Sequence, residues 1–334
     1  MHRIRQLDGV RALAILAVFL HHALRIKLMW AGVDLFFVLS GFLITGVLLN
    51  TRQRPLGGFF AHFYSRRARR ILVPYLLFLA VASIFLGSGW LHYWYFYILL
   101  TNLLRTLGIP VPQALLPLWS LAVEEQFYLV WPLAVYFLNE RALKKLCIAL
   151  IVVVPALRGA FHFADRWPIY ELTPFRMDLL ASGALLYLIW NSRRTVVERI
   201  GTLTGAILVA VGLSGLGLLA RFGITTDGNT RTGTVFIYEC CLFLSVGIML
   251  YALAGKGVAW LQTRPIAYIG RISYTMYLVH VGIIMLVQNK LHGYAAAAVA
   301  LGLTIAYAAV SWHLLERRLL STGGAKPRPQ FETA

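Results

Sequence analysis

Long apolar runs, separated by short polar segments, make up most of the chain. Ten of these runs are about as long as a helix that crosses a bilayer, roughly 20 residues. Each predicts a membrane-spanning α-helix, because a backbone surrounded by lipid must satisfy its hydrogen bonds within its own segment. The predicted spans cover residues 11–29, 32–50, 70–88, 118–138, 143–158, 174–191, 202–220, 234–254, 271–290 and 294–315.

Two segments depart from this pattern. Residues 92–104 form a short run rich in Trp and Tyr, which we interpret as re-entrant or interfacial. Residues 321–334 are polar and contain two prolines, and we expect a disordered cytoplasmic tail there. Because the loops are short and no internal repeat is evident, we predict a single transmembrane domain over residues 1–320. The expected fold is all-α, a polytopic membrane helix bundle of about ten transmembrane helices with both termini in the cytoplasm.

Composition supports a membrane protein. Hydrophobic residues make up 59% of the chain and charged residues 13%, and the mean hydropathy is +0.72. Soluble domains are about a quarter charged, so we expect lipid to cover much of this surface. The formal net charge of +18 permits two interpretations: binding to nucleic acid, or the basic cytoplasmic loops of a membrane protein.

The positions of the basic residues favour the membrane interpretation. With the N-terminus in the cytoplasm, 22 of the 31 basic residues lie in inside segments and eight in outside segments. This asymmetry follows the positive-inside rule and removes most of the case for nucleic acid. Cys147, Cys240 and Cys241 have neither metal-binding nor disulfide-framework spacing, so no metal site is predicted.

Ionisable side chains inside spans are expensive to bury in lipid, so each is a candidate functional residue. Arg11 lies at the cytosolic mouth of the first span, and His22 follows eleven residues later, roughly 16 Å along a helix. This spacing predicts an imidazole about halfway through the bilayer, where neutral histidine can act as a general base. The alternative is a structural histidine bonded to a neighbouring helix. Because His21 points about 100° away from His22, at most one of them is expected to face a given cavity.

Asp34 enters the second span from the outer side, in the segment GVDLFFVLSGFLIT. If the first two spans form a hairpin, its carboxylate can approach His22, fix the tautomer of the imidazole and stabilise the imidazolium. The alternative is an aspartate that caps the helix near the interface.

An arginine cluster lies at a cytosolic helix entrance, in the segment HFYSRRARRILVPY. It can anchor the helix under the positive-inside rule. It can also bind phosphate, because guanidinium groups bind phosphate bidentately whereas an ammonium group acts as a point charge. The diphosphate and 3′-phosphate of coenzyme A would suit such a site. The cluster consists of Arg66, Arg67, Arg69 and Arg70.

The segment PLWSLAVEEQFYLVWP contains further candidates. Trp119 and Glu124 could bind an acceptor sugar together, by ring stacking and hydrogen bonding. Alternatively, Glu124 and Glu125 cap the helix or form salt bridges. Elsewhere, Arg176 and Asp178 are expected to form a structural ion pair, and packing roles are expected for His280 and Glu316.

Taken together, these motifs resemble the acyltransferase-3 family of bacterial membrane acyltransferases, from Leu7 to about Leu319. Arg11 and His22 match the R-X10-H signature of that family. The other segments that resemble family blocks, in family order, are GVDLFFVLSGFLIT, RRARRILVPY, WSLAVEEQFYLVWP, FRMDLLASG, ISYTMYLVH and the Glu316–Arg317 ending.

The resemblance implies a ten-span bundle in a bacterial inner (cytoplasmic) membrane. It implies an acyl-CoA donor, most often acetyl-CoA, that binds from the cytosol, and O-acetylation of a carbohydrate or glycoconjugate such as a polysaccharide. It also implies roles for Arg11, His22 and an RxxR pair, either Arg66–Arg69 or Arg67–Arg70. Many relatives carry a fused extracytoplasmic hydrolase-like domain, and no such domain is expected in this chain.

The resulting hypothesis is an acyltransferase without a metal cofactor. Arg11 and the arginine cluster hold acyl-CoA, while His22, oriented by Asp34 or another acid, deprotonates the acceptor hydroxyl. We favour direct transfer, with a covalent acyl-histidine intermediate as the alternative. A transporter or flippase of a lipid-linked sugar or acyl group, and a non-catalytic receptor or scaffold, are rivals. The transporter is disfavoured because the sequence shows no inverted repeat and no paired broken helices.

Overall fold

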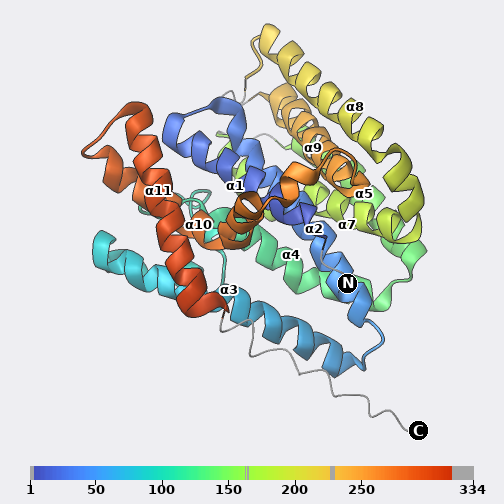
Figure 1. The fold of residues 1–334 in the computed structure, drawn as a ribbon, viewed down its shortest axis with the longest axis horizontal. Coiled ribbons are helices and arrows are strands. Elements are labelled where there is room, and N and C mark those ends of the chain that lie inside the picture. The colour runs from blue at the N-terminus through green and yellow to red at the C-terminus, as the bar shows by residue number, and fades with distance from the viewer. Residues whose placement is uncertain (1–3, 162, 164, 226–229, 318–334) are drawn as a thin grey trace.

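The computed structural model describes residues 4–161, 163, 165–225 and 230–317, and every regular element among them is helical. The predicted all-α membrane fold is confirmed, and the predicted tail lies outside the described residues. Ten helices of 16 to 31 residues form the described bundle (Figure 1), namely α1 (Gln6–Leu24), α2 (Gly32–Thr51), α3 (Leu56–Leu86), α4 (Leu118–Phe137), α5 (Glu140–Ala160), α7 (Met177–Ser192), α8 (Arg194–Arg221), α9 (Arg231–Ala254), α10 (Arg264–Gln288) and α11 (Gly293–Ser311).

Short helical elements occupy most of the connections. The segment predicted to be re-entrant consists of single turns of 3-10 helix, and the Tyr75 hydroxyl of α3 donates a hydrogen bond to the Phe96 carbonyl within it. The short elements are η1 (Lys27–Ala31), η2 (Gly89–His92), η3 (Trp94–Phe96), η4 (Thr101–Leu103), η5 (Gln113–Leu115), α6 (Trp167–Glu171), η6 (Thr173–Phe175), η7 (Ala259–Gln262) and the π-helix η8 (Trp312–Glu316).

Seven helices in the described part of the chain are long and apolar enough to cross a membrane, fewer than the ten predicted spans. Helix α7 is short, with 16 residues. Helix α4 carries Glu124 and Glu125 in its middle, and α5 carries a charged first turn and Arg158. Arg158 is buried and Glu124 and Glu125 are half-buried within the bundle, so other helices rather than lipid surround these ionisable groups.

The first helix begins earlier than predicted. Helix α1 spans Gln6–Leu24 rather than residues 11–29, and it ends where Arg25 adopts a left-handed conformation with φ of 56°. The residues after Arg25 form η1 instead of a further turn. His22 therefore lies in the last turn of α1, closer to its outer end than the predicted mid-membrane position.

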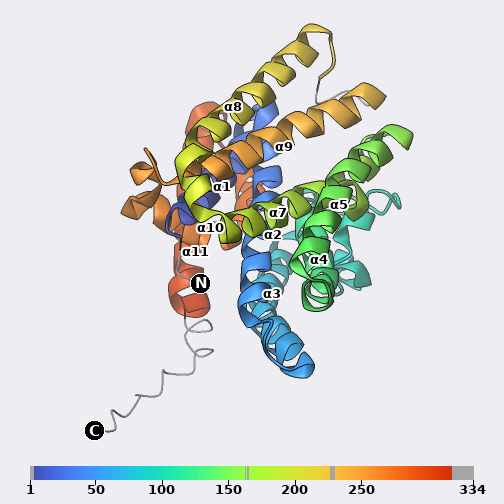
Figure 2. The same cartoon turned by 90° about the vertical axis from the view of Figure 1, so that its right-hand side faces the viewer.

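Helices α1, α2, α4, α7 and α10 form the centre of the bundle. Helices α8 and α9 run side by side along one flank in both views, whereas α3 lies at the opposite flank (Figures 1 and 2). At the contact between α2 and α7, a Cβ on Gly41 would lie 1.9 Å from the Leu180 carbonyl oxygen, and one on Gly183 would lie 1.9 Å from that of Val38. Only glycine permits this approach, which brings the two backbones into direct contact.

Two buried arginines are paired differently from the prediction. Arg176 forms an ion pair with Asp34, and Arg158 binds both Asp178, at 2.6 Å, and Glu239. Arg176 and Asp178 are two positions apart at the start of α7, and residues so spaced do not face each other on a helix. The predicted Arg176–Asp178 pair is therefore wrong, and Asp34 takes the place of Asp178.

Candidate active site

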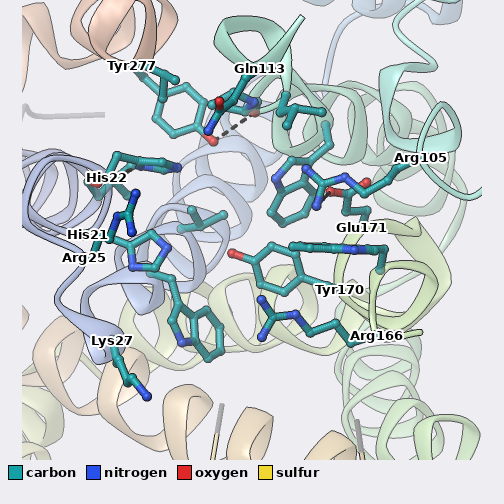
Figure 3. Close-up of a pocket in the computed structure, with 18 of the residues that line it drawn as sticks. His21, His22, Arg25, Lys27, Arg105, Gln113, Arg166, Tyr170, Glu171 and Tyr277 are labelled. Carbon is teal, nitrogen blue, oxygen red and sulfur yellow. Dashed lines mark hydrogen bonds and ion pairs between the residues drawn. The ribbon is translucent and has the colours of Figure 1, made fainter. Parts of the chain in front are cut away.

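Two cavities meet in the centre of the bundle. The outer cavity, of about 620 Å³, lies between the outer ends of α1 and α10, η1, the loop before α4, and α6 (Figure 3). The inner cavity, of about 210 Å³, lies between α1, α2, α3, α4 and α10. Val33 and Tyr277 line both cavities and thus form the wall between them.

Hydrogen bonds hold Tyr277 across this wall. Its hydroxyl donates to the Pro117 carbonyl oxygen at 3.0 Å and lies 2.6 Å from the Ser120 hydroxyl. Since both partners belong to the start of α4, they tie α10 to that helix at the boundary. The space inside the bundle is thus divided into two cavities with a shared side chain between them.

His22 lines the outer cavity and has a defined tautomer. The Nδ1 of His280 lies 2.7 Å from the Tyr277 carbonyl oxygen, so that nitrogen donates and the His280 Nε2 is left as an acceptor. The Nδ1 of His22 lies 3.2 Å from this Nε2 and 2.9 Å from the Val18 carbonyl oxygen. Because both neighbours are acceptors, the His22 Nδ1 carries the proton.

The Nε2 of His22 is consequently the nitrogen with a free lone pair, as a general base requires. His21 lines the same cavity, but its Nδ1 donates to the Ile26 carbonyl oxygen at 3.2 Å. The two rings meet edge to face, with centroids 5.0 Å apart. His21 thus holds the turn after α1, and the expectation that only one of the two histidines faces a given cavity is wrong.

The predicted hydrogen bond between Asp34 and His22 is absent from the described structure. Asp34 is fully buried and ion-paired with Arg176, whereas the His22 Nδ1 is occupied by Val18 and His280. The orienting group that the sequence assigned to an acid is therefore a second histidine, which was expected only to pack. His22 and His280 are 258 residues apart, and nothing local in either segment marks them as partners.

Four arginines line the inner cavity, which lies toward the helix ends that the sequence predicts to be cytosolic. Two of them, Arg67 and Arg70, come from the predicted cluster, and Arg11 was predicted independently. Arg66 and Arg69 do not line this cavity; Arg66 contacts His62, and the Arg69 Nε donates to the Ser65 carbonyl oxygen. The geometry therefore favours the Arg67–Arg70 register. The fourth is Arg271 of α10, which the sequence analysis did not single out.

Acidic and aromatic groups hold some of these arginines. The Arg67 guanidinium lies 4.0 Å from the centroid of the Tyr128 ring, and its Nη2 is 3.9 Å from Glu125. The Nη1 of Arg11 is 3.2 Å from an Asp8 oxygen. These contacts orient the cations in a cavity that is also lined by apolar residues of α2.

Trp119 and Glu124, predicted to bind an acceptor together, lie on opposite sides of the wall. Trp119 lines the outer cavity, with its ring centroid 4.7 Å from that of Tyr170. Glu124 lines the inner cavity and accepts hydrogen bonds of 2.9 Å from Ser40 and Tyr128. A single acceptor sugar in the outer cavity would not reach both. Among the described residues, no group of three or more His, Cys, Asp and Glu side chains could hold a metal ion.

Proteins of similar sequence indicate the family to which the chain belongs. Residues 4–315 match the family model described as an acyltransferase domain, the acyltransferase-3 family. The chain is 29% identical to the putative peptidoglycan O-acetyltransferase YrhL of Bacillus subtilis over 95% of its own length and 55% of that protein. It is 29% identical to the O-acetyltransferase OatA of Staphylococcus aureus, over 85% and 51%, and 31% identical to the peptidoglycan O-acetyltransferase OatA of Listeria monocytogenes, over 84% and 49%.

The chain thus spans about half the length of the curated relatives that it matches. No solved structure matches it significantly. The family match extends from before α1 to the end of α11, and it includes both cavities. The resemblance inferred from the motifs is confirmed: this multi-pass membrane protein belongs to the acyltransferase-3 family.

Proposed function

We propose that this protein transfers an acetyl or other short acyl group from cytosolic acyl-CoA to a hydroxyl of a carbohydrate or glycoconjugate. The observation that carries the proposal is that an arginine-lined cavity and a histidine-lined cavity lie on either side of Tyr277. Guanidinium groups line the inner one, and a histidine with a free Nε2 lines the outer one. A peptidoglycan glycan is a candidate acceptor, because relatives bear that name.

The inner cavity suits the donor. Four guanidinium groups can bind the diphosphate and 3′-phosphate of coenzyme A bidentately. Apolar side chains of α2, among them Phe36, Leu43 and Val47, line the same cavity and can pack against the pantetheine arm. The thioester then approaches Tyr277 from the cytosolic side.

The outer cavity suits the acceptor and the base. The Nε2 of His22 takes the proton of an acceptor hydroxyl, and the oxygen attacks the thioester carbonyl carbon. The new ester C–O bond forms as the C–S bond breaks, and the proton passes from the imidazolium to the departing thiolate. His280 keeps the ring of His22 oriented throughout, since its Nε2 accepts from Nδ1–H.

The test uses purified protein in lipid nanodiscs with radiolabelled acetyl-CoA and a panel of glycan acceptors. General-base catalysis contributes roughly 10²–10⁴-fold, so His22→Ala should lower acetyl transfer by at least two orders of magnitude while acetyl-CoA still binds. His21→Ala provides the matched control and should retain more activity. If labelled acetyl-CoA is neither consumed nor transferred with any acceptor, the result would contradict the enzyme hypothesis and support the transporter hypothesis.

A further inference from the structure

The outer cavity gathers positive charge on the side of the membrane where basic residues are scarce. Only eight basic residues lie in outside segments, and four of them line this cavity: Arg25, Lys27, Arg105 and Arg166. Topology favours Lys and Arg on the cytoplasmic side, so it does not account for this concentration. Of the described residues that line the cavity, Glu171 is the one carboxylate.

Arg25 occupies a position that its backbone disfavours. Its φ of 56° lies in the left-handed region, where glycine and asparagine are the favoured residues. It follows α1 directly, three residues after His22, and the hydrogen bond from His21 to the Ile26 carbonyl oxygen holds this turn. The turn thus keeps a guanidinium close in sequence to the proposed base, and strained residues of this kind cluster at functional sites.

Arg105 and Arg166 face them across the cavity (Figure 3). Arg105 lies 3.2 Å from a Glu171 oxygen, and its guanidinium is 3.6 Å from the centroid of the Trp167 ring. The Arg166 guanidinium is 4.7 Å from the same ring. Arg105 is thereby held in a fixed orientation by a buried acid and an aromatic face, with donors left for a ligand.

Resting on the proposed function, we propose that the acceptor is an anionic glycan. Arg25 and Lys27 on one side of the cavity and Arg105 on the opposite side hold carboxylate or phosphate groups of that glycan while a neighbouring hydroxyl faces the Nε2 of His22. Aromatic side chains between the cations, including Trp119 and Tyr170, offer surfaces for the sugar rings. The cavity volume of about 620 Å³ lies within the usual range of roughly 300–1,000 Å³ for ligand sites.

The experiment compares acceptors that differ only in charge, with the full chain in nanodiscs of neutral lipid. The probes are trigalacturonate, its carboxyl-reduced neutral counterpart, galactose 1-phosphate and galactose. Equilibrium binding is measured alongside acetyl transfer. One charge-assisted contact changes affinity by about tenfold or more, so we expect at least one charged probe to bind about tenfold tighter than its neutral partner. The stronger charged probe identifies the group as carboxylate or phosphate.

Variants locate the site. Arg25→Asn is compatible with the left-handed turn, and Lys27→Gln removes the second charge; together they should weaken binding of the charged probe about tenfold and leave the neutral probe unchanged. The matched control removes two outside cations that do not line the cavity, through Arg231→Gln and Lys290→Gln.

Equal binding of charged and neutral probes would overturn the inference, as would equal loss in the control variant. The inference would also be overturned if anionic lipid added to the nanodiscs binds to these cations while charged and neutral glycans bind with equal affinity. A charge preference without acetyl transfer to any probe would leave this inference standing and count against the proposed function, so the two failures are distinguishable.

Discussion

At the residue scale, the proposed role of His22 as a base depends on a proton that two acceptors hold at its Nδ1. One acceptor is the Val18 carbonyl oxygen, and the other is the Nε2 of His280. Replacing His280 by Ala removes the second acceptor and frees the imidazole of His22 to rotate. A misplaced base slows the chemical step but does not weaken the binding of the donor. We therefore expect kcat to fall about 10- to 100-fold, with the KM for acetyl-CoA unchanged.

The conservative variant separates positioning from packing. The Gln side chain of His280→Gln can present a carbonyl oxygen where the imidazole presented Nε2, so it should restore much of kcat. Steady-state kinetics of the two variants provide the check. If both variants lose activity equally while remaining folded, His280 contributes volume and not hydrogen-bond geometry.

Glu171 makes the outer cavity sensitive to pH. Burial raises the pKa of this carboxyl to about 7, with a further contribution from Asp165, although the Arg105 guanidinium opposes the shift. As the pH falls from 8 to 6, Glu171 therefore gains a proton and no longer neutralises Arg105. Trigalacturonate stays ionised over this range, so its Kd should decrease by roughly threefold, the scale of a partly exposed ion pair.

The measurement is equilibrium binding, which avoids the separate pH dependence of catalysis. In Glu171→Gln the acid is always neutral, and the Kd should lie near the low-pH value throughout. The groups that face Glu171 are Arg105 and, nearby, Asp165 and Arg166, whereas Arg25 and Lys27 lie across the cavity. A pH dependence that persists in Glu171→Gln would assign the titration to another group.

At the scale of the element, the proposed phosphate-binding arginines lie on one face of α3. Arg67 and Arg70 are three residues apart and point into the inner cavity, whereas Arg66 and Arg69 are rotated away by about 100° each. The double variant Arg67→Lys, Arg70→Lys keeps charge and topology but loses bidentate geometry. It should raise the KM for acetyl-CoA about tenfold or more.

The matched control is Arg66→Lys with Arg69→Lys, on the same helix and with the same net charge. Its KM for acetyl-CoA should stay within about twofold of the parent, because neither arginine lines the inner cavity. Isothermal titration calorimetry of acetyl-CoA binding distinguishes this control from the double variant at Arg67 and Arg70. Equal effects in both double variants would mean that the cluster is a topological anchor.

The sequence predicted what lies within one helix better than what lies between helices. Arg11 and the cluster on α3 were found from local spacing, because a helix puts residues three or four apart on one face. The partner of Asp34 is 142 residues away, and His280 is 258 residues from His22. Such pairs depend on which helices pack together, which the hydrophobic pattern of a single chain does not specify.

The contact between α2 and α7 makes its own prediction. At Gly41 an added methyl group would meet the Leu180 carbonyl oxygen, so Gly41→Ala must push the helices apart. Overpacking of this kind costs typically 1–3 kcal/mol. Gly217 in α8 has open space where a Cβ would be, so Gly217→Ala should be neutral or stabilising by up to about 1 kcal/mol. Thermal unfolding in detergent measures both, and equal melting temperatures would contradict the close backbone contact.

At the scale of the whole molecule, the bundle separates the cavities proposed for donor and acceptor by a wall that includes Tyr277. The sequence predicted a polytopic bundle with a basic cytosolic rim, but it did not predict two cavities. Tyr277 lies in ISYTMYLVH, a segment expected to pack, and its contacts with Ser120 and Pro117 are 157 and 160 residues away. A wall built from distant segments becomes visible only when all of the central helices are in place.

This wall should protect the thioester from water. Charged side chains such as Arg25 and Lys27 line part of the outer cavity. A water molecule that passed from this cavity to the donor could replace the acceptor hydroxyl in the attack, a side reaction that enclosed sites suppress. Tyr277→Ala removes the ring between the cavities, so acetyl-CoA should be hydrolysed faster without any acceptor. The Tyr277→Phe variant keeps the ring but loses the hydrogen bonds to Pro117 and Ser120, so it should hydrolyse acetyl-CoA at an intermediate rate.

The release of free coenzyme A measures the rate of hydrolysis. Adding His22→Ala to Tyr277→Ala should suppress this hydrolysis if the same base activates water. Unchanged hydrolysis in a folded Tyr277→Ala protein would mean that other side chains close the passage.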